Sequence, residues 1–159
     1  MKIGEHSLRD HLRLLAPLFG LITAVWVLRI VLNLAGAPMP VVRVFSVGLA
    51  GSISVLGAAF LIHFKRFGSY SNVVVSAFLL VFYAQLLVAL AIAFAALTRT
   101  ENVFAAAEFS FRMTYAQHIA SHLTVILGLQ SIMAAAMACL ILWMLRWLVP
   151  VTPKQGAHS

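Results

Sequence analysis

The feature that most constrains this chain is a series of four long apolar runs, at about residues 14–35, 41–64, 72–97 and 119–149. A helix needs about 20 mostly apolar residues to cross the hydrocarbon core of a bilayer, and each run is long enough. A spanning segment must also satisfy its own backbone hydrogen bonds, which favours helices. We therefore predict an all-α integral membrane protein, with four antiparallel transmembrane helices in a bundle.

The composition agrees with a lipid environment. Of the residues, 63% are hydrophobic and 9% are charged, whereas about a quarter of the residues are charged in soluble proteins. The net charge of +7 comes from basic residues at the ends of apolar runs, with no basic patch. The expected partner is thus the lipid bilayer and not a nucleic acid. We predict a single four-span membrane domain over residues 1–159, in which residues 150–159 are a loose tail.

Two further segments resemble helices that lie at the membrane surface. Residues 7–15, SLRDHLRLL, begin with a capping-box pattern and place leucines on one face. Residues 103–117 mix aromatic side chains with a glutamate and an arginine. We predict a short amphipathic interfacial helix in each segment.

The distribution of Lys and Arg predicts the orientation, because cytoplasmic loops carry an excess of basic residues. If the N-terminus is cytoplasmic, more basic residues lie inside than outside, so both termini are predicted to be cytoplasmic. The predicted inner set is Lys2, Arg9, Arg13, Lys65, Arg66, Arg146 and Lys154, and the outer set is Arg43, Arg99 and Arg112.

Small residues in the second run indicate close helix packing. Gly48 and Ser52 are four residues apart, as are Ser54 and Ala58. Such pairs let two helix backbones approach each other in a membrane. We expect them to pack the bundle itself, with docking of another protein as the alternative.

Arg29 is the one charged residue well within a predicted span, and Asn33 follows it by one helical turn. Polar groups at membrane depth are costly, so each is a functional hypothesis. Arg29 either extends to water or lipid phosphate, or binds an anionic group, with Glu101 and Glu108 as candidate partners within the chain. No acidic residue lies inside a predicted span, which argues against a transporter driven by a buried carboxylate.

Two glutamines are expected near the middle of the third and fourth spans. Gln85 and Gln130 would satisfy their amide groups by bonding to each other or to Ser131. This interpretation needs no role beyond holding the helices together.

His118 and His122 are four residues apart, so both rings leave the same face of a helix. They cannot both be axial ligands of one haem iron, and His63 is expected about 30 Å away at the opposite end of the bundle. A single-histidine haem or chlorophyll, or a divalent metal with Glu108 as a further ligand, stays open. The simpler interpretation is that the histidines contact lipid phosphate, water or loop backbone.

No catalytic constellation is visible in the sequence, so we do not expect an enzyme. The first functional hypothesis is an accessory or scaffold subunit that packs against other membrane proteins or against itself. The second is a metal-, haem- or pigment-binding subunit that uses His118 and His122. The third is a small oligomeric transporter or channel with Arg29 and Gln85 along its path.

Overall fold

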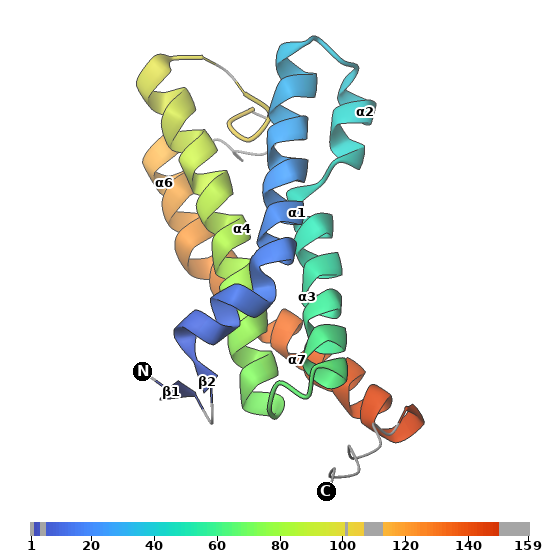
Figure 1. Ribbon diagram of the computed structural model, residues 1–159. Coiled ribbons are helices and arrows are strands. Elements are labelled where there is room, and N and C mark those ends of the chain that lie inside the picture. The colour runs from blue at the N-terminus through green and yellow to red at the C-terminus, as the bar shows by residue number, and fades with distance from the viewer. Residues whose placement is uncertain (1, 4–5, 101, 107–112, 150–159) are drawn as a thin grey trace, which may run out of the picture.

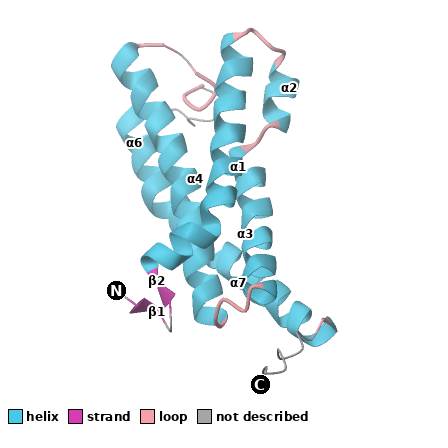
Figure 2. Ribbon diagram, viewed as in Figure 1, coloured by secondary structure: helices cyan, strands magenta, loops and turns pink. Residues whose placement is uncertain are grey.

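The computed structural model describes residues 2–3, 6–100, 102–106 and 113–149. Apart from two short antiparallel strands, β1 (Lys2–Ile3) and β2 (His6–Ser7), every regular element in these residues is helical (Figure 2). The helices are α1 (Leu8–Leu34), α2 (Met39–Val44), α3 (Val47–Phe64), α4 (Tyr70–Thr98), α6 (Tyr115–Ser121), the π-helical segment η1 (His122–Ile126) and α7 (Leu127–Leu148).

Four helical segments are long and apolar enough to cross a membrane: Leu8–Leu34, Met39–Phe64, Tyr70–Thr98 and Tyr115–Leu148. They follow the four predicted spans in number and order. The helical class of the protein and its four candidate spans therefore agree with the sequence-based prediction.

The predicted helix at residues 7–15 forms the first turns of α1 and is not a separate element. Ser7 and Asp10 make the expected capping box, in which the Ser7 amide donates to the Asp10 carboxylate at 2.8 Å. These first turns run obliquely to the rest of α1 (Figure 1). Pro17 lies within the helix and accounts for a bend, because its ring removes one backbone hydrogen bond and crowds the preceding turn.

The second predicted span, 41–64, is not one helix but two. The chain leaves helical geometry at Phe45 and Ser46, between α2 and α3. Ser46 is the N-cap of α3, and its hydroxyl accepts a hydrogen bond from the Leu49 amide at 3.4 Å. The pattern of apolar residues did not reveal this break. Its physical reason is the Ser46 cap, because a serine that accepts a hydrogen bond from the first turn favours the start of a helix.

The helix α4 lies at the centre of the bundle, in contact with α1, α3 and α7. In the most apolar 18 residues of each span, half of the residues are buried in α4, compared with 17% in the segment containing α1 and 11% in the segment ending in α7. Leu80 and Ile92 of α4 are fully buried. The helix α4 is thus the most enclosed of the four spans, and it carries the buried side chain of Gln85.

The segment 103–117, which we predicted as an interfacial helix, is helical only at 115–117 among its described residues, where it forms the start of α6. Residues 103–106 and 113–114 are not helical. The rest of the predicted helix, 107–112, lies outside the described residues. The last span begins at Tyr115, where Thr114 and Gln117 form a second capping box.

The strand pair, the α3–α4 connection and the end of α7 lie at one end of the bundle (Figure 1). There the ring of His6 stacks on that of Phe67, with 3.8 Å between centroids. The imidazole Nε2 of His63 donates to the Val149 carbonyl at 2.9 Å. The start of α6, with His118, lies at the other end, so His63 is remote from it, as its position in the sequence predicts.

Candidate functional site: a polar cavity beside a broken helix

A cavity of about 440 Å³ lies where the break between α2 and α3 faces α4, α6 and η1. Its polar lining comes from all four candidate spans. The polar lining residues that the structure describes are Arg29, Arg43, Ser46, Gln85, His118, Ser121, His122 and Gln130.

Four of these side chains form one hydrogen-bonded chain across four helical elements, α4, α6, η1 and α7. Gln85 of α4 donates from Nε2 to Oε1 of Gln130 on α7, at 2.6 Å. His122 Nδ1 lies 2.6 Å from Gln85 Oε1, and His122 Nε2 lies 3.2 Å from His118 Nε2. The structure therefore brings together the two pairs that the sequence singled out, Gln85 with Gln130 and His118 with His122.

The direction of each hydrogen bond follows from the chemistry of the atoms, with the amide of Gln85 assigned from the network. A carbonyl oxygen only accepts, so His122 Nδ1 carries the hydrogen that it donates to Gln85. His122 Nε2 then holds a lone pair and accepts from the Nε2–H of His118. The remaining nitrogen of His118, Nδ1, is left with a lone pair.

The Nδ1 atom of His118 is a buried polar atom with no hydrogen-bond partner among the residues that the structure describes. The side chain of His118 is only 3% exposed, and it lines the cavity. Buried polar groups are normally satisfied, and each exception needs an explanation. The end of the hydrogen-bonded chain is therefore a place where a ligand atom would be stabilised.

The helix changes type at this point. The π-helical segment η1 begins at His122 and ends at Ile126, between α6 and α7. Single π-helical turns inside α-helices are rare and occur frequently at functional sites. Here the wider turn begins at His122 and lies between His118 on α6 and Gln130 on α7.

The first turn of α3 also borders the cavity. Ser46, Val47 and Gly48 line it, and the amide groups of a first helical turn have no partners within the helix. Together with the helix dipole, these amides favour negative charge near them. Arg29 and Arg43 line the same cavity, so fixed positive charge from three elements meets there.

Arg29 and Asn33 make different contacts despite their shared helix face. The guanidinium of Arg29 lies over the ring of Phe104, 4.9 Å from its centroid, an arrangement typical of a cation–π interaction. Asn33 Oδ1 accepts a hydrogen bond from the Val103 amide at 3.0 Å. Asn33 thus holds the α4–α6 connection, whereas Arg29 borders the cavity.

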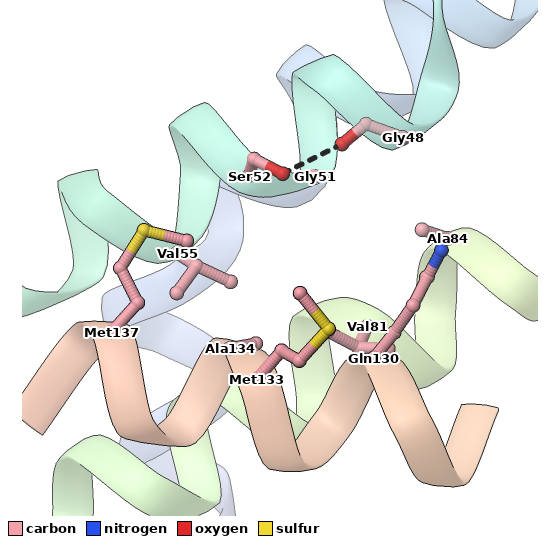
Figure 3. Close-up of a pocket in the computed structure, with 10 residues that line it drawn as sticks. All are labelled: Gly48, Gly51, Ser52, Val55, Val81, Ala84, Gln130, Met133, Ala134 and Met137. Atoms are coloured by element: carbon pink, nitrogen blue, oxygen red, sulfur yellow. Dashed lines mark hydrogen bonds between the residues drawn. The ribbon is translucent and has the colours of Figure 1, made fainter. Parts of the chain in front are cut away.

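A smaller groove of about 180 Å³ adjoins the cavity and lies between α3, α4 and α7, and the two share Gly48 and Gln130. Its lining is mostly apolar and small. In Figure 3 the side chain of Met137 reaches from α7 toward Val55 of α3. The two adjoining cavities therefore differ in their side chains: arginines and histidines line the larger one, whereas small residues, valines and methionines dominate the smaller one.

The two small-residue pairs of α3 have different surroundings. Ser54 and Ala58 are buried, and the Ser54 hydroxyl donates to the Leu18 carbonyl of α1 at 3.5 Å. Gly48 and Ser52 are exposed and line the groove, where the Ser52 hydroxyl bonds back to the Gly48 carbonyl (Figure 3). Of the two pairs, only Ser54 and Ala58 pack directly against a neighbouring helix.

Sequence reasoning missed Arg43, Ser46 and Ser121 as parts of the site. The signal that was available is the pair of prolines at the start of α2, Pro38 and Pro40, followed by Ser46, because an interrupted apolar segment in a membrane protein often marks a binding site. Glu108, the predicted third metal ligand, lies outside the described residues. In the described part, no group of three or more His, Cys, Asp or Glu side chains is placed to hold a metal ion.

Comparison of the chain with protein-family models, with curated proteins and with solved structures found no match.

Proposed function

We propose that this protein binds an amphiphile whose head group is negatively charged. The head occupies the polar cavity, and the apolar tail follows the groove between α3 and α7. The observation that carries this proposal is that the two cavities adjoin, sharing Gly48 and Gln130, while arginine and histidine side chains line only the larger one.

The charge of the head group is inferred from the lining. Arg29, Arg43 and the first turn of α3 all favour an anion. The lone pair on His118 Nδ1 favours a hydrogen-bond donor, such as a hydroxyl group. A head group that combines a phosphate with hydroxyl groups, as in phosphatidylglycerol, suits both.

The groove is expected to select ligands by the shape of the tail and to add little to the free energy of binding. Lipid tails already surround the protein, so an apolar tail gains little hydrophobic free energy on leaving the bilayer. Selectivity is therefore expected to reside in the head group, while the groove decides whether a tail can accompany it.

The first test exchanges one arginine at a time for glutamine. Arg29→Gln or Arg43→Gln should weaken retention of phosphatidylglycerol about tenfold, because hydrogen bonds to charged groups contribute about 1.5–3 kcal/mol each. Native mass spectrometry from nanodiscs that mix phosphatidylglycerol with phosphatidylcholine measures this. The matched control is Arg99→Gln, at the end of α4 and outside the described cavity lining.

The second test fills the groove from α3. Ser52→Phe should reduce retention of phosphatidylglycerol but leave binding of free glycerol phosphate unchanged, since only the tail is displaced. Ile53→Phe is the control, because Ile53 is exposed and does not line the groove. Equal retention of phosphatidylglycerol and phosphatidylcholine by the unmodified protein would contradict the proposal.

An accessory role is a second candidate, supported by the last span. The segment Tyr115–Leu148 buries only 11% of its most apolar window, and Ile132 and Trp147 are 71% and 75% exposed. Such a face suits another membrane helix. Cross-linking from Ile132→Cys in native membranes to one reproducible partner would support this candidate, and labelling by lipid alone would count against it.

A further inference from the structure

The geometry points to a second ligand at the same end of the bundle: we infer that His118 and His122 bind one divalent transition-metal ion of the class that imidazole prefers, represented by Zn²⁺. This inference rests on the positions of the two rings and not on the proposed amphiphile.

The distance between the two ring nitrogens matches that of two ligands on one metal ion. Zinc binds histidine nitrogen at about 2.0–2.1 Å with tetrahedral angles, which places two ligating nitrogens about 3.3 Å apart. The Nε2 atoms of His118 and His122 are 3.2 Å apart. An ion that displaces the hydrogen could therefore bind both atoms at their present separation, lying to one side of the line between them, with each ring turned so that its lone pair faces the ion.

The surroundings of His122 are those of a metal ligand. A ligating histidine almost always donates its other N–H to an oxygen that fixes the ring and raises its basicity. His122 Nδ1 makes such a bond to Gln85 Oε1, and Gln85 is held in turn by Gln130. This leaves the Nε2 lone pair of His122 directed at His118.

The remaining coordination positions face the cavity. Both histidines line it, and within the described residues no third strong ligand joins them. Water or an anionic oxygen in the cavity would complete the coordination shell, as in metal sites that keep an open position. When His118 ligates through Nε2, its Nδ1 carries the hydrogen and becomes a donor toward the cavity.

The test is titration of chelator-treated, full-length protein with Zn²⁺ alone, in a zwitterionic detergent without anionic lipid. Calorimetry and elemental analysis on the same sample should give one ion per chain. His118→Ala and His122→Gln should each abolish this stoichiometric binding. His63→Ala is the matched control, since His63 is also buried but bonds to Val149 at the opposite end.

A further variant separates ligation from folding. Gln85→Leu removes no ligand but releases His122, and loss of such a supporting partner lowers metal affinity about 10- to 100-fold. Circular dichroism establishes that each variant keeps its helices, and His122→Gln retains a polar side chain if the alanine variant does not fold. Each result is read on folded protein only.

Three results would overturn the inference: no stoichiometric Zn²⁺ binding by the unmodified protein, binding that survives both histidine variants, or binding lost equally in His63→Ala. Repeating the phosphatidylglycerol experiment in the presence of chelator keeps the two proposals separate. Retention of the lipid without metal would leave the proposed function standing even if the metal site fails.

Discussion

At the scale of single residues, the amide of Gln85 connects three elements. It accepts a hydrogen bond from His122 on η1 and donates one to Gln130 on α7, while its own backbone belongs to α4. Gln85 is only 5% exposed, whereas Gln130 is exposed toward the groove. In a membrane these bonds would have no competition from bulk water, and the hydrogen-bonded side chains would then fix the relative rotation of the helices.

We expect Gln85→Leu to lower the free energy of unfolding by about 1–3 kcal/mol, because it leaves a buried donor of His122 unsatisfied. Gln130→Leu should cost less, since it removes one bond at an exposed position. Unfolding in mixed micelles, followed by circular dichroism, measures both. A larger loss for Gln130→Leu than for Gln85→Leu would show that the amide of Gln85 is not the central connection.

At the scale of elements, the α4–α6 connection is fixed to the bundle by two asparagines. Asn102 Nδ2 donates to the Ala91 carbonyl of α4 at 2.8 Å, and its Oδ1 accepts from the Phe104 amide at 3.0 Å. Val103 and Phe104 are buried. This segment holds the ring of Phe104 against Arg29, so a loop contact supports a cavity residue on α1.

We expect Asn102→Ala to increase hydrogen exchange at the Phe104 amide about tenfold, because a side-chain hydrogen bond contributes about 1 kcal/mol. Thr100→Ala, a nearby exposed position, should leave that exchange unchanged. Mass spectrometry of peptides covering residues 102–106 gives the measurement. Equal exchange in both variants would mean that burial alone protects this connection.

At the scale of the whole molecule, four candidate spans place the start of α1 and the end of α7 at the same end of the bundle (Figure 1). The cavity lies toward the opposite end, beside the break between α2 and α3. If the basic residues predict the orientation correctly, the cavity opens toward the outer half of the membrane.

Cysteine labelling tests this orientation. In a Cys139→Ala background, Thr100→Cys should react with an impermeant maleimide added to intact cells, and Ser71→Cys should react only after lysis. Both positions are exposed and lie at opposite ends of α4. Labelling of Ser71→Cys from outside would invert the predicted orientation.

The spans were predictable because their length and apolarity are set by bilayer thickness, a strong and local constraint. The His118–His122 proximity was equally predictable, since helix periodicity alone puts the two residues on one face. The contribution of Arg43 was not, because it depends on where α2 folds back relative to α1. The break at Ser46 was obscured by apolar residues on both sides, although a serine cap was present.

The π-helical segment from His122 to Ile126 can be gained or lost in evolution through a small change in the gene. A π-helical turn holds one residue more than an α-helical turn, so it can arise or vanish through insertion or deletion of a single codon. Removing that codon would leave an uninterrupted α-helix of almost unchanged composition with the same number of turns, so Gln130 would keep nearly the same facing while the backbone next to the histidines would change. Genes with and without that codon would encode proteins that look alike in hydropathy and differ in the backbone geometry beside the histidine pair.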